Sequence, residues 1–258
     1  MLVTGEELSA MVGAYFWPFV RIAAMISAMP IFSSNFIPVR IRLIFAIALT
    51  TVIAPVIPPV PIIDAISLNG FLLIIQQLAI GVSMGFIFHI VFAAFTIAGQ
   101  IIAMQMGLGF STMIDPVNGS HTPVLSMFYI LLVTLLFFIM NGHLVMISVV
   151  AQSFHSMPIA VTGLAAEQFW DIVIWAKIMF VGATLISLPA VTALLFANMS
   201  LGLIGRAAPQ LNIFAVGFSI TIVAGFFVLM MSMSVVVTQF ETIALDAFGM
   251  IKAIPGVK

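Results

Sequence analysis

Two long stretches of this chain carry no formal charge, and they constrain its fold more than any other feature. Residues 65–114 and 116–166 contain no Asp, Glu, Lys or Arg. Roughly a quarter of the residues in a soluble protein are charged, whereas charged residues make up 6% of this chain and hydrophobic residues 64%. Most side chains must therefore face lipid or other protein, and we predict an integral membrane protein.

Proline and turn residues divide the chain into apolar helices. About 20 apolar residues cross the hydrocarbon core, so 258 residues leave no room for a sizeable soluble domain. We predict an all-α fold in which residues 1–258 form a single unit of long, kinked hydrophobic helices and hairpins. The expected helices lie at about 8–28, 41–57, 68–106, 124–153, 167–199 and 211–247, with Pro189 as a kink in the fifth.

Several of these helices are too long for an ordinary crossing. The segment from Leu68 to Met106 contains no proline, and at 1.5 Å per residue it would reach roughly 60 Å, about twice the hydrocarbon thickness. Val124 to Met157 and Gln210 to Ile254 are also free of proline. We therefore expect such helices to bend back, tilt strongly or project into a protein assembly.

The segment 107–123, GLGFSTMIDPVNGSHTP, lies between two very hydrophobic helices and is rich in turn signals. Irregular backbone at membrane depth must lie in water or inside protein, where it can line a cavity. The apolar residues Phe110, Met113 and Ile114 favour the cavity. The alternative is a solvated hairpin loop with a few buried anchors, which composition alone favours.

Patterns typical of catalysis or metal binding are missing from the sequence. None of the three lysines follows a glycine, which excludes the phosphate-binding GxxxxGK[ST] loop of an ATP-driven pump. The four histidines form neither HExxH nor a close ligand pair. The acidic residues lie near expected helix ends, whereas a proton-coupled carrier needs a carboxylate inside the membrane. We predict no catalytic, cofactor-binding or metal-binding residues, no enzymatic activity and no nucleic-acid binding.

Arg21 is the one charge well inside an expected span. Burial there costs about 2.5 kcal/mol or more unless the arginine pairs or faces water, so we predict that it points into protein and pairs there. Gly81 with Gly85, and Gly217, Thr221 and Gly225, are small residues at four-residue spacing, which predicts close helix packing.

Methionines cluster around the 107–123 segment, at Met104, Met106 and Met113. Thioethers bind copper(I) or act as pliable apolar filler, and the absence of cysteine and of clustered histidine favours filler. If such side chains face a pore, they would form a compliant hydrophobic seal.

Four stretches resemble the FliR/SctT family of type III export gate subunits, and together they extend over essentially the whole chain. The first is RIAAMISAMPIFSSNFIPVRIR, and the second is the 107–123 segment. The others are NGHL at 141–144 and GRAAPQLNIFAVG at 205–217. The flagellar branch is favoured, and the injectisome SctT-type subunits are the near alternative.

The resemblance implies a subunit of the protein export gate in the bacterial inner membrane, at the flagellar basal body. It implies assembly with several copies of FliP and FliQ, contact with FlhB and FlhA, and passage of flagellar proteins. Family members are built as a FliP-like part followed by a FliQ-like part, in a helical ring raised largely out of the bilayer plane.

The resemblance further implies that residues 107–123 form a plug loop inside the closed pore. The plug candidates are Gly107, Gly109, Phe110, Met113, Ile114, Asp115, Pro116 and Gly119, with Met104 and Met106 as pore seal candidates. Structural or assembly roles fall to Arg21, Pro30, Pro38, Arg42, Asn141, Arg206, Pro209, Gln210 and Asn212. A small-molecule carrier and a scaffold without a pore-lining role are the alternatives.

Overall fold

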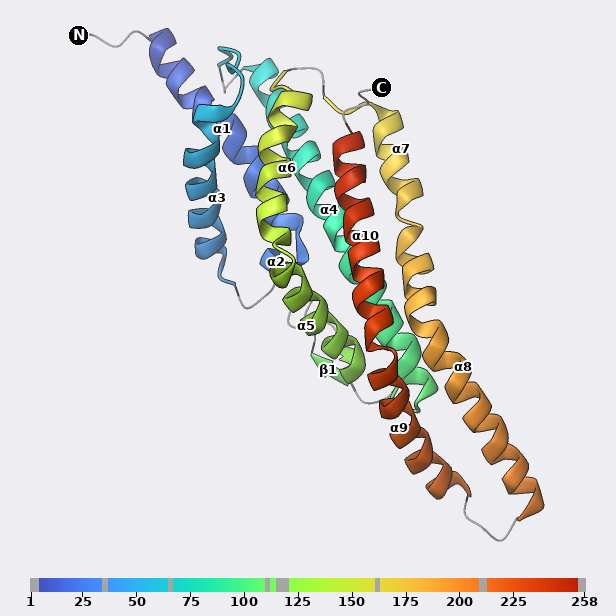
Figure 1. The fold of residues 1–258 in the computed structure, drawn as a ribbon. Helices are drawn as coiled ribbons and strands as arrows, with labels where there is room; N and C mark the ends of the chain where they lie inside the picture. The colour runs from blue at the N-terminus through green and yellow to red at the C-terminus, as the bar shows by residue number, and fades with distance from the viewer. Residues whose placement is uncertain are drawn as a thin grey trace. The chain divides into compact units, whose positions relative to one another are not determined.

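The computed structural model is built almost entirely of helices (Figure 1). It describes residues 5–33, 37–64, 67–109, 112–114, 121–160, 163–208 and 213–254, and only the backbone of 5–11, 112–114, 121–122 and 213–216. The first helices are α1 (Gly5–Ala28), α2 (Pro30–Ser33), α3 (Val39–Ile53) with a 3-10 turn (Ala54–Val56), and α4 (Leu68–Gln105). Two strands follow, β1 (Thr112–Ile114) and β2 (His121–Pro123). The remaining helices are α5 (Val124–Ile139), α6 (Gly142–Ser156), α7 (Ala166–Trp175), α8 (Ile178–Ala207), α9 (Ile213–Met231) and α10 (Met233–Ala253).

α1, and α3 with its 3-10 turn, agree with the expected ranges 8–28 and 41–57 to within three residues at each end, and α4 ends one residue before the expected 106. α4 is a single helix of 38 residues, so its backbone extends over roughly 57 Å. The proline-free, charge-free composition of this segment therefore predicts its length correctly. The helix does not bend back on itself by breaking into a hairpin.

The expected helix 124–153 is wrong in one respect, because the structure divides it into α5 and α6. The break occurs at Asn141, which has a left-handed backbone with φ of 56°. Asparagine tolerates this conformation better than most residues, and the backbone leaves the α-helical region there. The expected helices 167–199 and 211–247 are likewise each divided in two. The first is α7 and α8, which meet at 176–177, and the second is α9 and α10, which meet at Ser232. α8 continues through Pro189 to Ala207.

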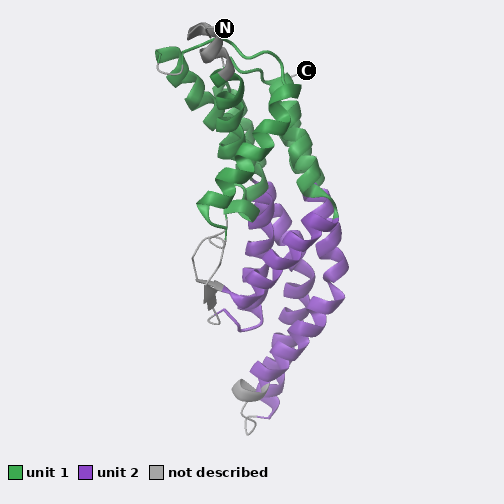
Figure 2. Cartoon of the chain, turned by 90° about the vertical axis from the view of Figure 1, so that its left-hand side faces the viewer, with its two compact units in different colours: residues 1–89, 140–176, 245–258 green, residues 90–139, 177–244 purple. Residues whose placement is uncertain are grey.

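The chain forms two compact units, each assembled from stretches that are distant in sequence (Figure 2). Unit 1 contains residues 1–89, 140–176 and 245–258, and unit 2 contains residues 90–139 and 177–244. Both α4 and α10 contribute one part to each unit. Trp17, Met25 and Leu73 belong to the buried core of unit 1, and Phe95 and Phe240 pack edge to face in the core of unit 2.

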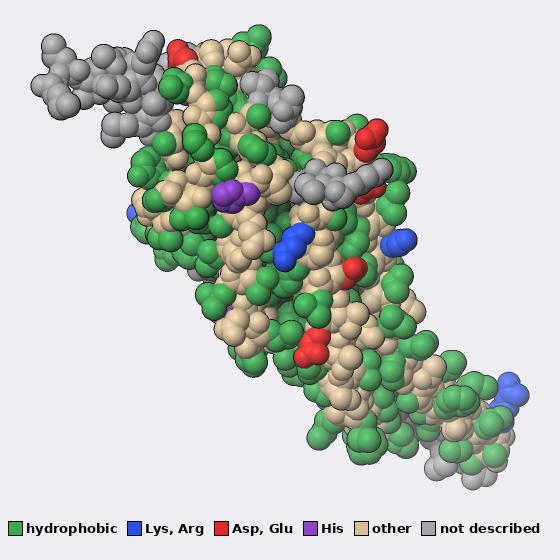
Figure 3. Space-filling model, turned by 45° about the horizontal axis from the view of Figure 1, so that its top comes forward, with side chains coloured by type: hydrophobic (Ala, Val, Ile, Leu, Met, Phe, Trp, Pro, Cys, Tyr) green, Lys and Arg blue, Asp and Glu red, His purple; other side chains and the backbone are tan. Residues whose placement is uncertain are grey.

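The surface is unusually apolar for a protein in water. Figure 3 shows hydrophobic side chains spread over the visible face, with only isolated charged groups among them. Four helices in the described part of the chain are long and apolar enough to cross a membrane, or five if the bent pair α5 and α6 counts as one span. In an apolar 18-residue stretch of α4, 67% of the residues are buried, whereas only 17% are buried in Val39–Val56. The structure therefore contains several candidate membrane spans, in line with the predicted membrane character.

Candidate functional site: the α4–α5 hairpin and the buried Arg21

The candidate plug segment begins where α4 stops, and Gly107 stops it. Gly107 has a φ of 78°, in the left-handed region that favours glycine. Its N–H donates to the carbonyl of Met104 (3.1 Å), and the N–H of Leu108 donates to the carbonyl of Ala103 (2.8 Å). These two bonds are those of a Schellman motif with glycine at the first position after the cap. Gly107 is thus a defined helix terminator rather than a source of flexibility.

A short antiparallel hairpin follows this stop, where the sequence predicted only irregular backbone. Thr112 pairs with Pro123, Met113 with Thr122, and Ile114 with His121. Both strands lie beside α5. The hairpin therefore brings the two ends of residues 115–120 together. Four of the plug candidates lie outside the described residues: Phe110, Asp115, Pro116 and Gly119. Met113 and Ile114 are described by their backbone alone.

The base of the hairpin is held by a close crossing of α5 over α4. The Ser126 hydroxyl donates to the carbonyl of Thr96 at 2.9 Å. A Cβ atom on Gly99 would lie 2.6 Å from the Cα atom of Ser126, closer than real Cβ contacts allow. Only glycine permits this approach. The sequence analysis did not assign Ser126 a role, and its only signal was a glycine inside an apolar helix.

The two methionines beside the hairpin occupy different surroundings. Met104 is 67% exposed and lies in the last turn of α4, next to Gly109. Met106 is fully buried, and its Cε atom would lie 2.5 Å from a Cβ atom on Gly225 of α9. The glycine in α9 therefore provides the space that the Met106 thioether fills. The predicted packing surface of Gly217, Thr221 and Gly225 is thus confirmed at Gly225, which packs against Met106.

Arg21 lies in unit 1 and is fully buried. Its Nε donates to Gln77 Oε1 (2.8 Å), Nη1 donates to the carbonyl (2.9 Å) and Oγ (3.2 Å) of Ser153, and Nη2 donates to the carbonyl of Met157 (2.9 Å). The guanidinium also lies 4.2 Å from the ring centroid of Phe154. No carboxylate from the described residues contacts it.

The charge of Arg21 is compensated by neutral groups, chiefly at one helix end. Ser153 and Met157 lie at the C-terminal end of α6, where unsatisfied carbonyls carry a partial negative charge. The prediction that Arg21 points into protein is confirmed. Its partners are carbonyl, amide and hydroxyl oxygens and an aromatic ring, which tie α1 to α4 and α6.

The crossing of α1 and α4 depends on two glycines. A Cβ atom on Gly81 would lie 2.3 Å from the Arg21 carbonyl oxygen, and one on Gly85 would lie 2.6 Å from Ala28 Cβ. The two backbones approach this closely because neither glycine has a side chain. The predicted Gly81 and Gly85 packing surface is therefore confirmed, and its partner is α1.

The other residues assigned structural roles lie at helix ends. Pro30 is buried at the start of α2, and Pro38 immediately precedes α3. The Nε of Arg42 donates to the carbonyl of Ile37 at 3.1 Å. Arg206 is exposed in the last turn of α8. Three further residues lie outside the described part of the chain: Pro209, Gln210 and Asn212.

Comparison with known proteins gives one consistent result. The family model of bacterial export proteins, family 1, matches residues 12–247. The chain is 39% identical to the flagellar biosynthetic protein FliR of Escherichia coli K12 over 225 residues, which cover 86% of this chain and 85% of that protein. It is 40% identical to FliR of Pectobacterium carotovorum (83% and 82% covered) and 30% identical to FliR of Bacillus subtilis (86% and 87% covered).

Proposed function

Because this chain belongs to the FliR family of bacterial export proteins, which are not enzymes, we propose that it is a subunit of the flagellar type III export gate. It forms with FliP and FliQ a channel in the bacterial inner membrane that exports flagellar proteins. The curated relatives that carry the name FliR support the flagellar branch over the injectisome SctT-type subunits.

We propose that residues 107–123 act as the plug of this channel. The pairing of β1 with β2 is the observation that carries the proposal, since it holds the two sides of the segment together beside α5. The Schellman stop at Gly107 and the Ser126 anchor hold both ends of the base.

The seal role belongs to Met104 rather than to Met106 in this proposal. Met104 presents an exposed, flexible thioether at the foot of the hairpin. Met106 is covered by α9, so its contribution is to hold α4 in place. Unfolded substrates pass when these apolar side chains part, and ions are held back when they close.

The proposed partners are FliP and FliQ, with FlhB and FlhA as further contacts. Exposed apolar side chains provide surface for these contacts, as they would for lipid. On the α8 and α9 hairpin they include Phe196, Met199, Phe227 and Met230. We retain the description of a FliP-like part followed by a FliQ-like part as part of this proposal.

The plug is tested by replacing residues 110–120 with a Gly-Ser linker of equal length. We expect raised ion leakage from cells that express the assembled complex, with unchanged co-purification of FliP and FliQ. A matched control replaces residues 57–66, the connection before α4, with a linker of the same composition, and it should not raise the leak.

Two results would reject parts of the proposal. Normal assembly with an unchanged leak in the 110–120 variant would leave only a scaffolding role. If the chain fails to co-purify with FliP and FliQ when the three proteins are expressed together, a small-molecule carrier that works as a monomer or dimer would be favoured instead.

A further inference from the structure

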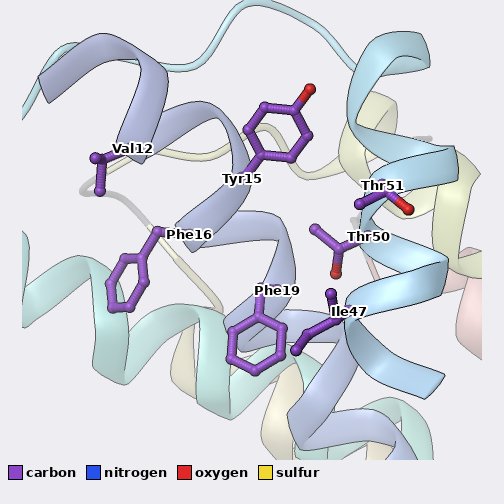
Figure 4. A pocket seen from close by; sticks show the side chains of 7 residues that line it. All are labelled: Val12, Tyr15, Phe16, Phe19, Ile47, Thr50 and Thr51. Atoms are coloured by element: carbon purple, nitrogen blue, oxygen red, sulfur yellow. The ribbon is translucent and has the colours of Figure 1, made fainter. Parts of the chain in front are cut away.

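An apolar groove lies between α1 and α3 in unit 1 (Figure 4). Val12, Tyr15 and Phe19 line one wall, Ile47 and Thr51 line the other, and the groove has a volume of about 540 Å³. Figure 4 shows Ile47 beside Phe19 at one end of the groove. The groove is open to the surface, and Val12, Tyr15 and Ile47 are each about half exposed. No side chain among the described residues of unit 1 fills it.

A second apolar groove continues along the same helix. It lies between α1 and α4, has a volume of about 570 Å³ and shares Phe19 with the first groove. On α1 the two grooves together follow Val12, Phe19, Ala23 and Ser27, whose spacings of seven and four residues place them on one helix face. At 1.5 Å per residue this strip is roughly 22 Å long. It is long enough for the acyl chain of one leaflet, which covers about half of the ~30 Å hydrocarbon core.

The positive charges of this part of the chain lie between Glu6 and Glu7 on one side and Asp64 on the other. Residues 8–63 contain Arg21, Arg40 and Arg42 and no acidic residue. Arg21 is bound by its neutral partners, and Arg42 donates to the carbonyl of Ile37. Arg40 is exposed, and no acceptor among the described residues contacts its guanidinium. This arginine is therefore available for an anion from outside the chain.

Arg40 lies on the groove face of α3. It precedes Ile47 by seven residues and Thr51 by eleven, spacings that return to nearly the same side of a helix. The rise per residue places it roughly 10 Å beyond Ile47 along the helix axis. A cation thus stands beyond one end of an apolar groove, on a helix that is long and apolar enough to contact lipid.

We propose that this groove binds one anionic phospholipid, with an acyl chain along Phe19 and Ile47 and the headgroup phosphate at Arg40. Arginine pairs with phosphate through charge-assisted hydrogen bonds. The volume lies within the range of small-ligand pockets, about 300–1,000 Å³. The sequence contains no basic run that would recruit a charged membrane surface, but one bound lipid needs only one well-placed cation. The lipid would cover apolar surface that unit 1 leaves open.

The test measures lipid retained by the full chain, purified with its partner subunits in a mild detergent and analysed by native mass spectrometry and lipid extraction. We expect about one anionic phospholipid per chain in the wild type. Arg40→Gln removes the headgroup contact and Thr51→Phe fills the groove, so each should reduce retention at least about threefold. The control Lys177→Gln removes an exposed lysine from unit 2 and should leave retention unchanged. Wild-type retention in both groove variants, or no retained lipid in the wild type, would overturn the proposal.

A partner subunit is the competing occupant, and a crosslinking experiment distinguishes it from a lipid. The chain has no cysteine, so Ile47→Cys introduces a single thiol into the groove. We expect little crosslinking from this position to other subunits of the purified complex when a short bifunctional reagent is used. Efficient crosslinking to a neighbouring subunit would show that protein fills the groove, and the lipid assignment would be wrong.

Discussion

The substitution Gly81→Ala tests whether α1 and α4 are held together by direct backbone contact. The added Cβ would lie 2.3 Å from the Arg21 carbonyl oxygen and 2.7 Å from Ala24 Cβ. Ordinary contacts begin at 3.4 Å, so the helices must separate by about 1 Å. Both opposing atoms are backbone or the first side-chain atom, which cannot rotate away.

The expected magnitude follows from two opposing terms. Alanine in a helix interior is favoured over glycine by about 1 kcal/mol. Overpacking a close contact costs about 1–3 kcal/mol and occasionally more. A separation of about 1 Å would also lengthen the bond from Arg21 Nε to Gln77 Oε1, now 2.8 Å, beyond the length of a hydrogen bond. We therefore expect net destabilisation of roughly 1–3 kcal/mol.

The matched control is Gly202→Ala in α8. Gly202 is an exposed helix-interior glycine, and no described atom lies within 4 Å of its added Cβ. Only the propensity term acts there, so the isolated chain should be unchanged or more stable by up to about 1 kcal/mol.

Thermal unfolding of the isolated chain in detergent measures both effects. Gly81→Ala should lower the Tm, and Gly202→Ala should not. The reasoning fails if Gly81→Ala is as stable as the wild type, or if both variants lose the same stability.

Three further predictions concern the hairpin and the buried arginine. Gly107→Val should destabilise the chain by at least about 1–2 kcal/mol, because a β-branched residue is strained at a φ of 78°. The loss is measured as a lower Tm, and the variant should also raise ion leakage if the hairpin is the plug. Met104→Ala should raise ion leakage with little change in Tm, because Met104 is exposed. Met106→Ala should lower the Tm, because it leaves a cavity that costs about 2–5 kcal/mol of unfolding free energy. The opposite result for the two variants would mean that their assigned roles are exchanged. Arg21→Met should cost about 2–5 kcal/mol of unfolding free energy, since it leaves buried oxygens without donors. Equal stability of the variant and the wild type would show that the hydrogen bonds of Arg21 are dispensable.

The break at Asn141 shows where composition misleads. The stretch from Val124 to Ser156 contains neither proline nor charge, so it reads as one helix. A single residue with positive φ divides it. Asparagine adopts both helical and left-handed conformations, so the residue type alone does not reveal which one the fold imposes. The same applies to Gly107, where the choice between a flexible plug residue and a helix stop depends on two backbone hydrogen bonds.

Membrane character, family membership, the extent of α4 and the inward direction of Arg21 all follow from the order of residues. Membrane character, the extent of α4 and the direction of Arg21 depend on charge and hydrophobicity along a continuous stretch, whereas family membership depends on four specific stretches of sequence. The oxygens that compensate Arg21 do not follow from it, because they lie 56 to 136 positions away along the chain. The pairing of β1 with β2, the burial of Met106 against Gly225 and the groove between α1 and α3 do not follow from it either. These features exist only because folding brings distant segments into contact, and the free energy of such contacts is set by distances that no local pattern contains.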